Sequence, residues 1–340
     1  MGAQPGDYPG YQKVSNDAVR EKFEAAWGVK LSPKPGLTAT ECFPAAIRGE
    51  IKGLYICGED PVVSDADTAH IVKALERLDF LVVQDLFLTK SAQYADVVLP
   101  AVSYAEKEGT FTNTERRVQR VRRAVTLEGE MRTDIDIITD LMNAMGYPQP
   151  RLTSAQVMDE IASLTPSYAG ISHARLDAGE SLQWPCKGGD HPGTPIMHVG
   201  SPVRGRALLY PAEFNPAAEL PDEEYPLILS TGRILYHYNA AAMTSRAPGL
   251  MEIAGEGFIE LNFRDAEALG IANGERVRVT SRRGSITATA RVGRKVSQGE
   301  SWMPFHFPDS PVNRLTNAAL DEFARIPEYT VCAVRVEKLA

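Results

Sequence analysis

Cysteine is scarce in this sequence, and its few cysteines form no pattern that would hold a metal. The four cysteines, Cys42, Cys57, Cys186 and Cys332, are scattered and include no CxxC pair. Zinc knuckles and iron–sulfur clusters need closely spaced thiolates, and disulfide frameworks belong to much shorter secreted chains. The residues present therefore offer neither. Cys57 and Cys332 lie in the apolar runs LYICG and TVCAVRV, which predicts that both are small core residues.

Long apolar runs and an excess of positive charge are also absent. No stretch reaches the roughly 20 apolar residues of a transmembrane helix, and no signal peptide is recognisable. We therefore expect a cytoplasmic protein without a membrane segment. The net charge of −8 argues against nucleic acid as a partner. One basic segment, ERRVQRVRRAV (115–125), could bind an anion, but a solvated strand face with internal ion pairs is favoured.

The usual signatures of catalysis and phosphate binding are missing as well. The sequence has no GxGxxG or GxxxxGK loop, no HExxH, no Ser-His-Asp order and no helix with paired carboxylates suited to acid–base work. Spacing alone therefore locates no reactive group. What is present is an ordinary globular composition, with 44% hydrophobic and 24% charged residues, and 340 residues are enough for two or three packed units.

The first region, residues 1–135, has the pattern of a partial doubly wound α/β domain. The run 51–58 is apolar throughout, which predicts a buried strand of a parallel sheet, and the runs 80–84 and 97–101 predict two further strands. A helix capped by Asp65 would place four apolar residues on one face: Ile71, Ala74, Leu75 and Leu78. A short helical turn is expected at 91–96. This alternation of strands and helices is typical of the doubly wound class.

The remaining chain divides into a connector and a β domain. Residues 136–221 carry two amphipathic helices, and the stretch from Gly179 to Pro221 is rich in turn residues, which predicts a helical and irregular connector. Residues 222–340 contain short strand patterns, a hairpin signal at SRRGS and one helix ending at Gly270. Short strands around one helix indicate a small closed β-barrel.

Polar residues follow the first two predicted strands. GEDP supplies Gly58, Glu59, Asp60 and Pro61, and VVQDLFLT supplies Gln84, Asp85 and Thr89. Ligands of doubly wound sheets bind beyond the carboxyl ends of the strands. Carboxylates there suit ribose hydroxyls or the N–H edge of guanine, because an ionised carboxylate only accepts hydrogen bonds. A plain β-turn explains GEDP equally well, and ordinary surface polar residues at a strand end explain VVQDLFLT equally well.

The stretch STGRILYHYN (230–239) also combines polar groups closely. Gly232 lets backbone approach a ligand, Arg233 can bind a phosphate or a planar carbonyl in two-pronged fashion, and His237 can donate or accept. A packed barrel loop with a buried histidine is an equally good interpretation of the spacing alone.

Taken together, eleven segments resemble the catalytic subunits of molybdopterin oxidoreductases of the dimethyl sulfoxide reductase family, with the formate dehydrogenase alpha subunits as the most similar branch. They occur in family order over almost the whole chain, and the resemblance covers the C-terminal half of such a subunit. The segments are DYPGY (7–11), GEDP (58–61), VVQDLFLTKSAQYADVVLP (82–100), EGTFTNTERRVQ (108–119), RTDIDII (132–138), MGYP (145–148), YPLILSTGR (225–233), HYN (237–239), DAEALGI (265–271), VNRLTN (312–317) and PEYTVCAVRVE (327–337).

The resemblance implies a function in holding a cofactor. The family binds molybdenum or tungsten between two molybdopterin guanine dinucleotides. Residues 1–135 would hold one guanosine end, and a barrel of double-psi type at 222–340 would cap the pterins. The implied cofactor-binding residues are Gly58, Glu59, Asp60, Pro61, Gln84, Asp85, Thr89, Asp134, Arg233, His237, Tyr238, Asn239, Asn313 and Tyr329.

The resemblance assigns no catalytic residue and no metal ligand to this chain. The family's cysteine or selenocysteine metal ligand and its [4Fe-4S] cluster lie in the N-terminal half, which would be a partner together with electron-transfer subunits. Formate is the implied substrate. A non-catalytic binding module or fragment, and another family substrate such as nitrate, remain alternatives. Two departures are Thr330, where a lysine is common in the family, and Ile234, where some members have a polar residue.

Overall fold

The structure is a computed structural model that describes residues 4–126, 129–200, 202 and 205–339. The chain forms two compact units. Unit 1 comprises Met1–Thr38 and Leu99–Ala212, and unit 2 comprises Ala39–Val98 and Glu213–Ala340. The chain thus passes from unit 1 into unit 2 and back before it ends in unit 2. The linear division into 1–135, 136–221 and 222–340 stays a prediction.

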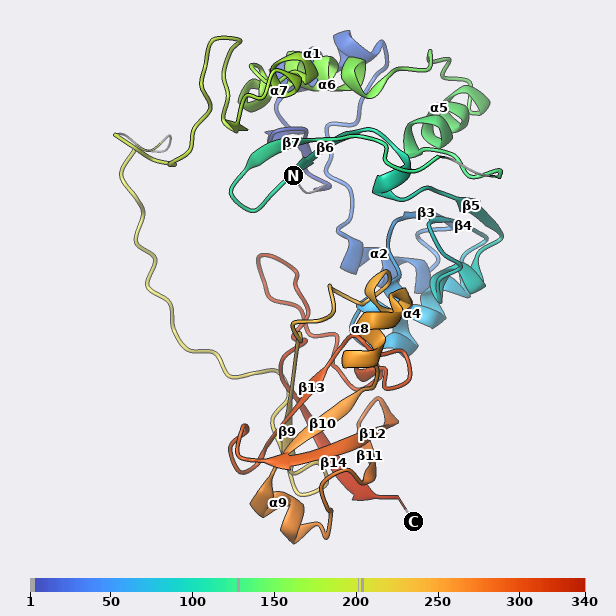
Figure 1. The fold of residues 1–340 in the computed structure, drawn as a ribbon, viewed down its shortest axis with the longest axis vertical. Coiled ribbons are helices and arrows are strands. Elements are labelled where there is room, and N and C mark those ends of the chain that lie inside the picture. The colour runs from blue at the N-terminus through green and yellow to red at the C-terminus, as the bar shows by residue number, and fades with distance from the viewer. Residues whose placement is uncertain (1–3, 127–128, 201, 203–204, 340) are drawn as a thin grey trace. The chain divides into compact units, whose positions relative to one another are not determined.

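Unit 2 begins with the predicted α/β segment (Figure 1). The sheet order is β3-β4-β5, and β3 and β4 are parallel. The elements are α2 (Ala39–Ile47), β3 (Gly53–Cys57), α3 (Pro61–Ser64), α4 (Thr68–Leu75), β4 (Phe80–Asp85), the 3-10 turn η1 (Ser91–Tyr94) and β5 (Val97–Pro100). Ile71, Ala74 and Leu75 of α4 are buried together with Leu81 and Val83 of β4, so the amphipathic pattern is confirmed.

Two details of this segment differ from the sequence-based expectation. Cys57 is exposed rather than a core residue, and within β3 only Ile56 is fully buried, so this strand is covered less completely than its apolar letters predicted. The helix cap is Asp67, whose carboxylate accepts from the N–H of His70, and not Asp65. Because the cap residue lies two positions after Asp65, the carboxylate of Asp65 is left for other contacts.

Unit 1 packs short strands against helices. Its sheets are β1-β2 and β6-β7-β8, and all their pairs are antiparallel. The elements are β1 (Asp7–Tyr8), β2 (Gln12–Lys13), α1 (Asp17–Trp27), η2 (Tyr104–Glu106), β6 (Gly109–Thr112), β7 (Arg117–Val121), α5 (Asp134–Ala144), α6 (Ser154–Leu164), η3 (Pro166–Tyr168), α7 (His173–Asp177) and β8 (Leu182–Gln183). One core cluster joins Val118 of β7, Met158 of α6 and Leu182 of β8. The two predicted connector helices are α5 and α6.

The basic segment around β7 is a strand face with internal partners, as the favoured interpretation stated. Arg120 and Arg122 both form ion pairs with Asp177, at 2.9 and 2.5 Å. Arg116 donates to the carbonyl oxygens of Trp184 and Thr194. Most of the basic stripe therefore neutralises or caps groups of its own unit.

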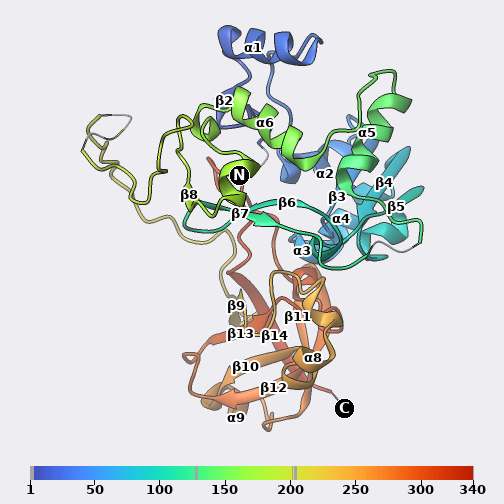
Figure 2. The ribbon, with the colours of Figure 1, turned by 45° about the horizontal axis from the view of Figure 1, so that its top comes forward.

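The second part of unit 2 is a closed six-stranded barrel (Figures 1 and 2). The strand order around it is β10-β12-β11-β14-β9-β13, which leaves no free edge. The strands are β9 (Leu227–Gly232), β10 (Phe258–Asn262), β11 (Arg276–Ser281), β12 (Gly284–Gly293), β13 (Glu300–Pro304) and β14 (Cys332–Lys338). The predicted closed barrel is confirmed, as are the hairpin between β11 and β12 and the helix α9 (Phe263–Ala268), which is followed by Gly270 with φ +66°.

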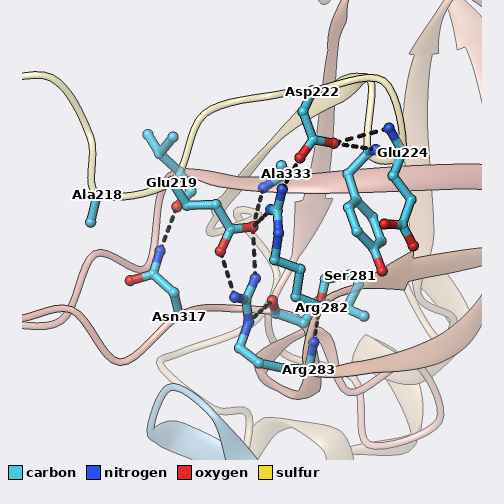
Figure 3. Close-up of polar contacts among 12 residues, drawn as sticks. Ala218, Glu219, Asp222, Glu224, Ser281, Arg282, Arg283, Asn317 and Ala333 are labelled. Atoms are coloured by element: carbon cyan, nitrogen blue, oxygen red, sulfur yellow. Dashed lines mark hydrogen bonds and ion pairs between the residues drawn. The ribbon is translucent and has the colours of Figure 1, made fainter.

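An ion-pair network joins the approach to β9 to the β11–β12 hairpin. Figure 3 shows the carboxylate of Glu219 between the guanidinium groups of Arg282 and Arg283. Glu219 also accepts from the N–H of Ala333 at 2.8 Å, and Arg283 donates to the carbonyl oxygen of Leu315. The irregular stretch before the barrel is thereby fixed to the barrel at Glu219.

None of the helices formed by the described residues combines the length and the apolar character that a membrane span requires.

Candidate functional site

The turn after β3 is built as a tight loop whose backbone faces the end of β4. Gly58 has φ +66°, and its N–H donates to the carbonyl oxygen of Gln84. The carboxylate of Asp60 accepts from the N–H and hydroxyl of Ser91 at 2.9 and 2.6 Å. Pro61 is buried at the first position of α3. Asp60 thus fixes the turn to η1, which leaves Glu59 as its solvent-accessible carboxylate.

The polar residues after β4 divide into supporting and accessible groups. Gln84 is buried and its amide oxygen accepts from the hydroxyl of Tyr55. Thr89 is buried and its hydroxyl accepts from the N–H of Ala92 at the start of η1. Gln84 therefore joins β4 to β3 through the side chain of Tyr55, and Thr89 holds the backbone of η1. Asp85 is half-buried, and one of its oxygens accepts from the N–H groups of Leu86 and Phe87.

Three carboxylates in this segment have raised pKa values, although Glu59 remains exposed while Asp65 and Asp85 are half-buried. Burial raises the pKa of Glu59, and the carboxylate of Asp85 raises it further. Burial likewise raises the pKa of Asp85. Burial raises the pKa of Asp65 to about 6, against the effect of the Ser64 hydroxyl that donates to it. Carboxylates that have lost water gain from a ligand that donates hydrogen bonds. Ribose hydroxyls and the N–H edge of guanine fit this donor requirement.

The loop after β9 presents Arg233. An added Cβ on Gly232 would lie 2.9 Å from Nε1 of Trp302, so the close approach of this side chain requires glycine. Arg233 is exposed, lies over the ring of Phe305 at 5.1 Å and donates from Nη2 to Oδ1 of Asn239 at 3.2 Å. A guanidinium has five donors, so most of its N–H groups remain for a phosphate or a pterin edge.

His237 and Tyr238 differ in their surroundings. His237 is buried, with Nε2 2.7 Å from the carbonyl oxygen of Ala254 and Nδ1 3.0 Å from the hydroxyl of Thr244. Tyr238 is 77% exposed. Both ring nitrogens of His237 thus have partners within the loop, which favours the alternative of a satisfied buried histidine, while Tyr238 is accessible to a ligand. A contact of either residue with a cofactor stays a prediction.

Asn313 and Tyr329 meet the α/β segment within unit 2. Asn313 is buried in the 3-10 turn η5 (Val312–Arg314), and its amide donates to the carbonyl oxygens of Val63 and Ser64. Burial, with the nearby carboxylate of Asp65, raises the pKa of Tyr329 to about 12. The structure therefore brings these two residues together with the end of α3, next to the carboxyl edge of the sheet.

Asp134 belongs to unit 1. It is the first residue of α5, behind the cap residue Thr133, and forms an ion pair with Lys107. An acidic residue in the first helical turn is also stabilised by the helix dipole, so its position has a local explanation. Its cofactor contact stays a prediction.

One residue of the barrel loops was missed by sequence reasoning. His306, two residues after the end of β13, is fully buried and contacts the backbone of Ile234 and Asn239. The only sequence signal was an aromatic run, FHF, at the end of a predicted strand. In the described part of the chain, no group of three or more His, Cys, Asp or Glu side chains could hold a metal ion. The exposed donors of the β9 loop and the carboxylate acceptors of the sheet edge are chemically suited to a polar, planar or phosphorylated ligand.

Comparison with protein families gives two matches. The molybdopterin oxidoreductase model matches residues 2–144, and the molybdopterin dinucleotide binding domain model matches residues 227–333. The second match covers most of the barrel, including the β9 loop, and the first covers the whole β3–β5 sheet with Glu59 and Asp85.

Comparison with single proteins gives relatives that match this chain over its whole length, while the match covers only part of each relative. The chain is 48% identical, over its whole length, to 50% of an F420-dependent formate dehydrogenase subunit alpha of Methanocaldococcus jannaschii. It is 36% identical, again over its whole length, to 48% of formate dehydrogenase H of Escherichia coli. The chain therefore spans about half the length of these curated relatives.

The fold has a counterpart among solved structures. Acetylene hydratase from Pelobacter acetylenicus superposes with a TM-score of 0.70 over 98% of this chain and 51% of that chain, at 18% sequence identity. At this identity the match supports the fold alone. One family model covers the sheet edge, the other covers most of the barrel, and the relatives match the chain from end to end. This protein therefore belongs to the molybdopterin oxidoreductase family.

Proposed function

We propose that the chain holds molybdopterin guanine dinucleotide in the catalytic subunit of a formate dehydrogenase. The observation that carries this proposal is the 48% identity, along the entire chain, to the alpha subunit of an F420-dependent formate dehydrogenase. Since the relatives are about twice as long, the activity would belong to the whole subunit. The metal ligand and the [4Fe-4S] cluster would be supplied by the half that this chain does not match.

Each accessible group has a distinct task in this proposal. Glu59 and Asp85 accept hydrogen bonds from the ribose and guanine of one dinucleotide, which favours the charged forms that the raised pKa values disfavour. Arg233 donates to a pterin edge or a phosphate, and Tyr238 and Asn239 lie beside it in the same loop. Gly58, Asp60, Pro61, Gln84 and Thr89 shape the turns that carry the acceptors. Asp134, Asn313 and Tyr329 complete the proposed set.

The bound group would supply the redox chemistry. Molybdenum or tungsten, held by two dinucleotides, would accept the two electrons when formate is oxidised to carbon dioxide with loss of one proton. The residues of this chain bind and orient the cofactor; none of them is assigned to the bond-breaking step. The electrons would leave through the iron–sulfur cluster to electron-transfer subunits in the cytoplasm.

Cofactor content tests the binding part of the proposal. The chain is produced in a host that makes molybdopterin guanine dinucleotide, and the pterin and guanine nucleotide released on denaturation are measured per chain. We expect both in the purified wild-type chain assembled with the remaining catalytic-subunit half, and a marked loss of pterin in Arg233→Ala. Arg278→Ala, an exposed arginine on β11, is the matched control and should retain wild-type content. Wild-type protein without pterin in the assembled state would refute the proposal.

Substrate choice is tested on the same assembly. We expect formate-dependent reduction of a viologen dye, or of F420, the acceptor in the name of the relative. Turnover of nitrate without turnover of formate would establish the nitrate alternative. Tight cofactor binding with neither activity would favour a non-catalytic binding module.

A further inference from the structure

His306 connects two loops of the barrel through both of its ring nitrogens. β9 and β13 are parallel neighbours, with Gly232 paired to Pro304, so both strands end at the same edge of the barrel. The imidazole of His306, which follows β13, accepts at Nε2 from the N–H of Ile234 at 3.0 Å. Its Nδ1 contacts the carbonyl oxygen of Asn239. One fully buried side chain thus holds both ends of the Ile234–Asn239 loop.

The two backbone partners define the protonation state of the ring. A backbone N–H can only donate, so Nε2 of His306 must be unprotonated. A carbonyl oxygen can only accept, so Nδ1 must carry the proton. A second proton on Nε2 would point at the N–H of Ile234. The neutral Nδ1–H tautomer is therefore the form that satisfies both contacts.

The surroundings of His306 also favour the neutral ring. Its neighbours are aromatic, with Phe305 and Phe307 on either side in sequence and the ring centroid of His237 at 5.6 Å. The pKa of His306 is lowered, chiefly by burial, and Arg233 and His237 lower it further, against the effect of the Asn239 carbonyl. These are the titratable or charged groups that face the ring, and neither favours a positive charge on it.

The loop needs such external support. Asn239 and Ala241 have φ of +47° and +58°, a conformation that non-glycine residues adopt at an energetic cost. Asn239 is held by His306 at its carbonyl oxygen, and its side chain accepts from Nη2 of Arg233. Asn239 therefore links the two residues, because its backbone contacts His306 and its side chain contacts the guanidinium of Arg233.

We propose that His306 is the positioning residue for Arg233, and that its neutral Nδ1–H form holds the Ile234–Asn239 loop in the conformation in which Arg233 binds the pterin or phosphate of the cofactor. The cofactor part of this statement rests on the proposed function, whereas the loop part does not. His306 forms its hydrogen bonds with loop backbone groups, and its ring lies against neighbouring aromatic rings.

Two substitutions separate hydrogen bonding from packing. Leucine fills similar space but offers neither donor nor acceptor, whereas glutamine offers one of each. In His306→Leu we expect the pterin content of the assembled enzyme to fall by about tenfold, as loss of two buried backbone hydrogen bonds implies. His306→Gln should recover most of it. A folded leucine variant with wild-type content, or a glutamine variant as poor as leucine, would overturn the proposal.

A readout without cofactor tests the loop separately. Trypsin cleaves after arginine, and the Arg233–Ile234 bond should be protected in the wild-type chain, cut faster in His306→Leu and protected again in His306→Gln, while cleavage at the exposed Lys295 stays constant.

Nitrogen-15 NMR of the wild-type imidazole of His306 should show an unprotonated Nε2 at pH 7, and this measurement requires no variant to fold. An Nε2–H tautomer, or unchanged cleavage in the leucine variant, would refute the loop part. If the cleavage pattern at Arg233 and the tautomer of His306 are as expected but no variant and no wild-type protein holds pterin, the loop part stands and only the proposed function is refuted.

Discussion

The side-chain amide of Asn313 donates to the carbonyl oxygen of Val63 at 2.8 Å, across 250 positions of sequence. A second N–H of the same amide donates to the carbonyl oxygen of Ser64 at 3.1 Å. These two carbonyls lie at the end of α3, where helix carbonyls otherwise lack intrahelical donors. Asn313 therefore caps α3 from the barrel side and joins the two parts of unit 2.

Replacing Asn313 should destabilise unit 2. In Asn313→Ala the carbonyl oxygens of Val63 and Ser64 lose their donor, which costs roughly 1–3 kcal/mol in the free energy of unfolding. Urea unfolding measures the change. Gln93→Ala, which removes an exposed amide from the same unit, is the control and should shift the midpoint little. Equal midpoints for the two variants would show that the Asn313 contacts contribute nothing.

Asp65 should make the protein less stable as the pH rises. Its pKa is raised from 3.8 to about 6 in the folded state, first by burial and then by Glu59. The folded chain therefore holds the proton more tightly than the unfolded chain, and the stability that this gives is lost as the pH rises from about 4 through 6. Asp65→Asn should raise the unfolding free energy at pH 7.5 by roughly 2 kcal/mol, with no gain near pH 4.

The control for this pH dependence is Asp79→Asn, which removes an exposed carboxylate from the same segment. It should leave the unfolding free energy nearly unchanged at both pH values. If Asp65→Asn gives the same small change at pH 7.5, the carboxylate is solvated and the explanation by burial is wrong.

Glu219 should act in the opposite direction. Burial disfavours its charge, but Arg283, the N–H of Ala333 and Arg282 outweigh burial and lower its pKa below 4.5. Its contribution is therefore fully present above pH 4.5 and is lost as the pH falls through the lowered value. Glu219→Gln should cost roughly 2 kcal/mol of unfolding free energy at pH 7, and the difference from wild type should shrink in acid. Glu223→Gln, an exposed neighbour, is the control, and a pH-independent difference would contradict this account.

Gly232 should not tolerate a side chain while Trp302 is present. In Gly232→Ala the new Cβ would meet the indole at 2.9 Å, so the variant should lose roughly 1–3 kcal/mol of unfolding free energy. Trp302→Phe removes the clashing atoms, and the double variant should be more stable than the sum of the single effects. Gly293→Ala, where no atom lies within 4 Å of the added Cβ, should be nearly neutral. Additive effects in the double variant would disprove the clash.

Periodicity predicted the elements of this fold well because each depends on nearby residues. The β11–β12 hairpin follows from alternation around a two-residue turn, and α9 ends at Gly270 as its sequence indicates. Local signals were weaker where two candidates competed, as with Asp65 and Asp67, since the choice of cap depends on where α4 meets the core. Cys57 was misplaced because an apolar run does not reveal that one face of its strand is left open.

The candidate site was predictable in its location but less so in the roles of its residues. Strand ends and the β9 loop were singled out, yet spacing could not show that Asp60 bonds to Ser91, Gln84 to Tyr55 and Thr89 to the N–H of Ala92. Nor could it show His306 reaching the backbone of residues 234 and 239, because that contact exists only once β9 and β13 are paired. Contacts of this kind depend on tertiary pairing rather than on local pattern.

The division of unit 2 into two stretches also affects how the chain would fold on the ribosome. The strands of the barrel, from Leu227 to Lys338, are consecutive and can close as soon as they emerge. The α/β stretch, Ala39–Val98, emerges first but waits through the synthesis of Leu99–Ala212 before Asn313 can cap α3. Incomplete early segments of this kind expose apolar surface and strand edges, which chaperones recognise. During synthesis, a chaperone should therefore bind the strands of the α/β stretch rather than those of the barrel.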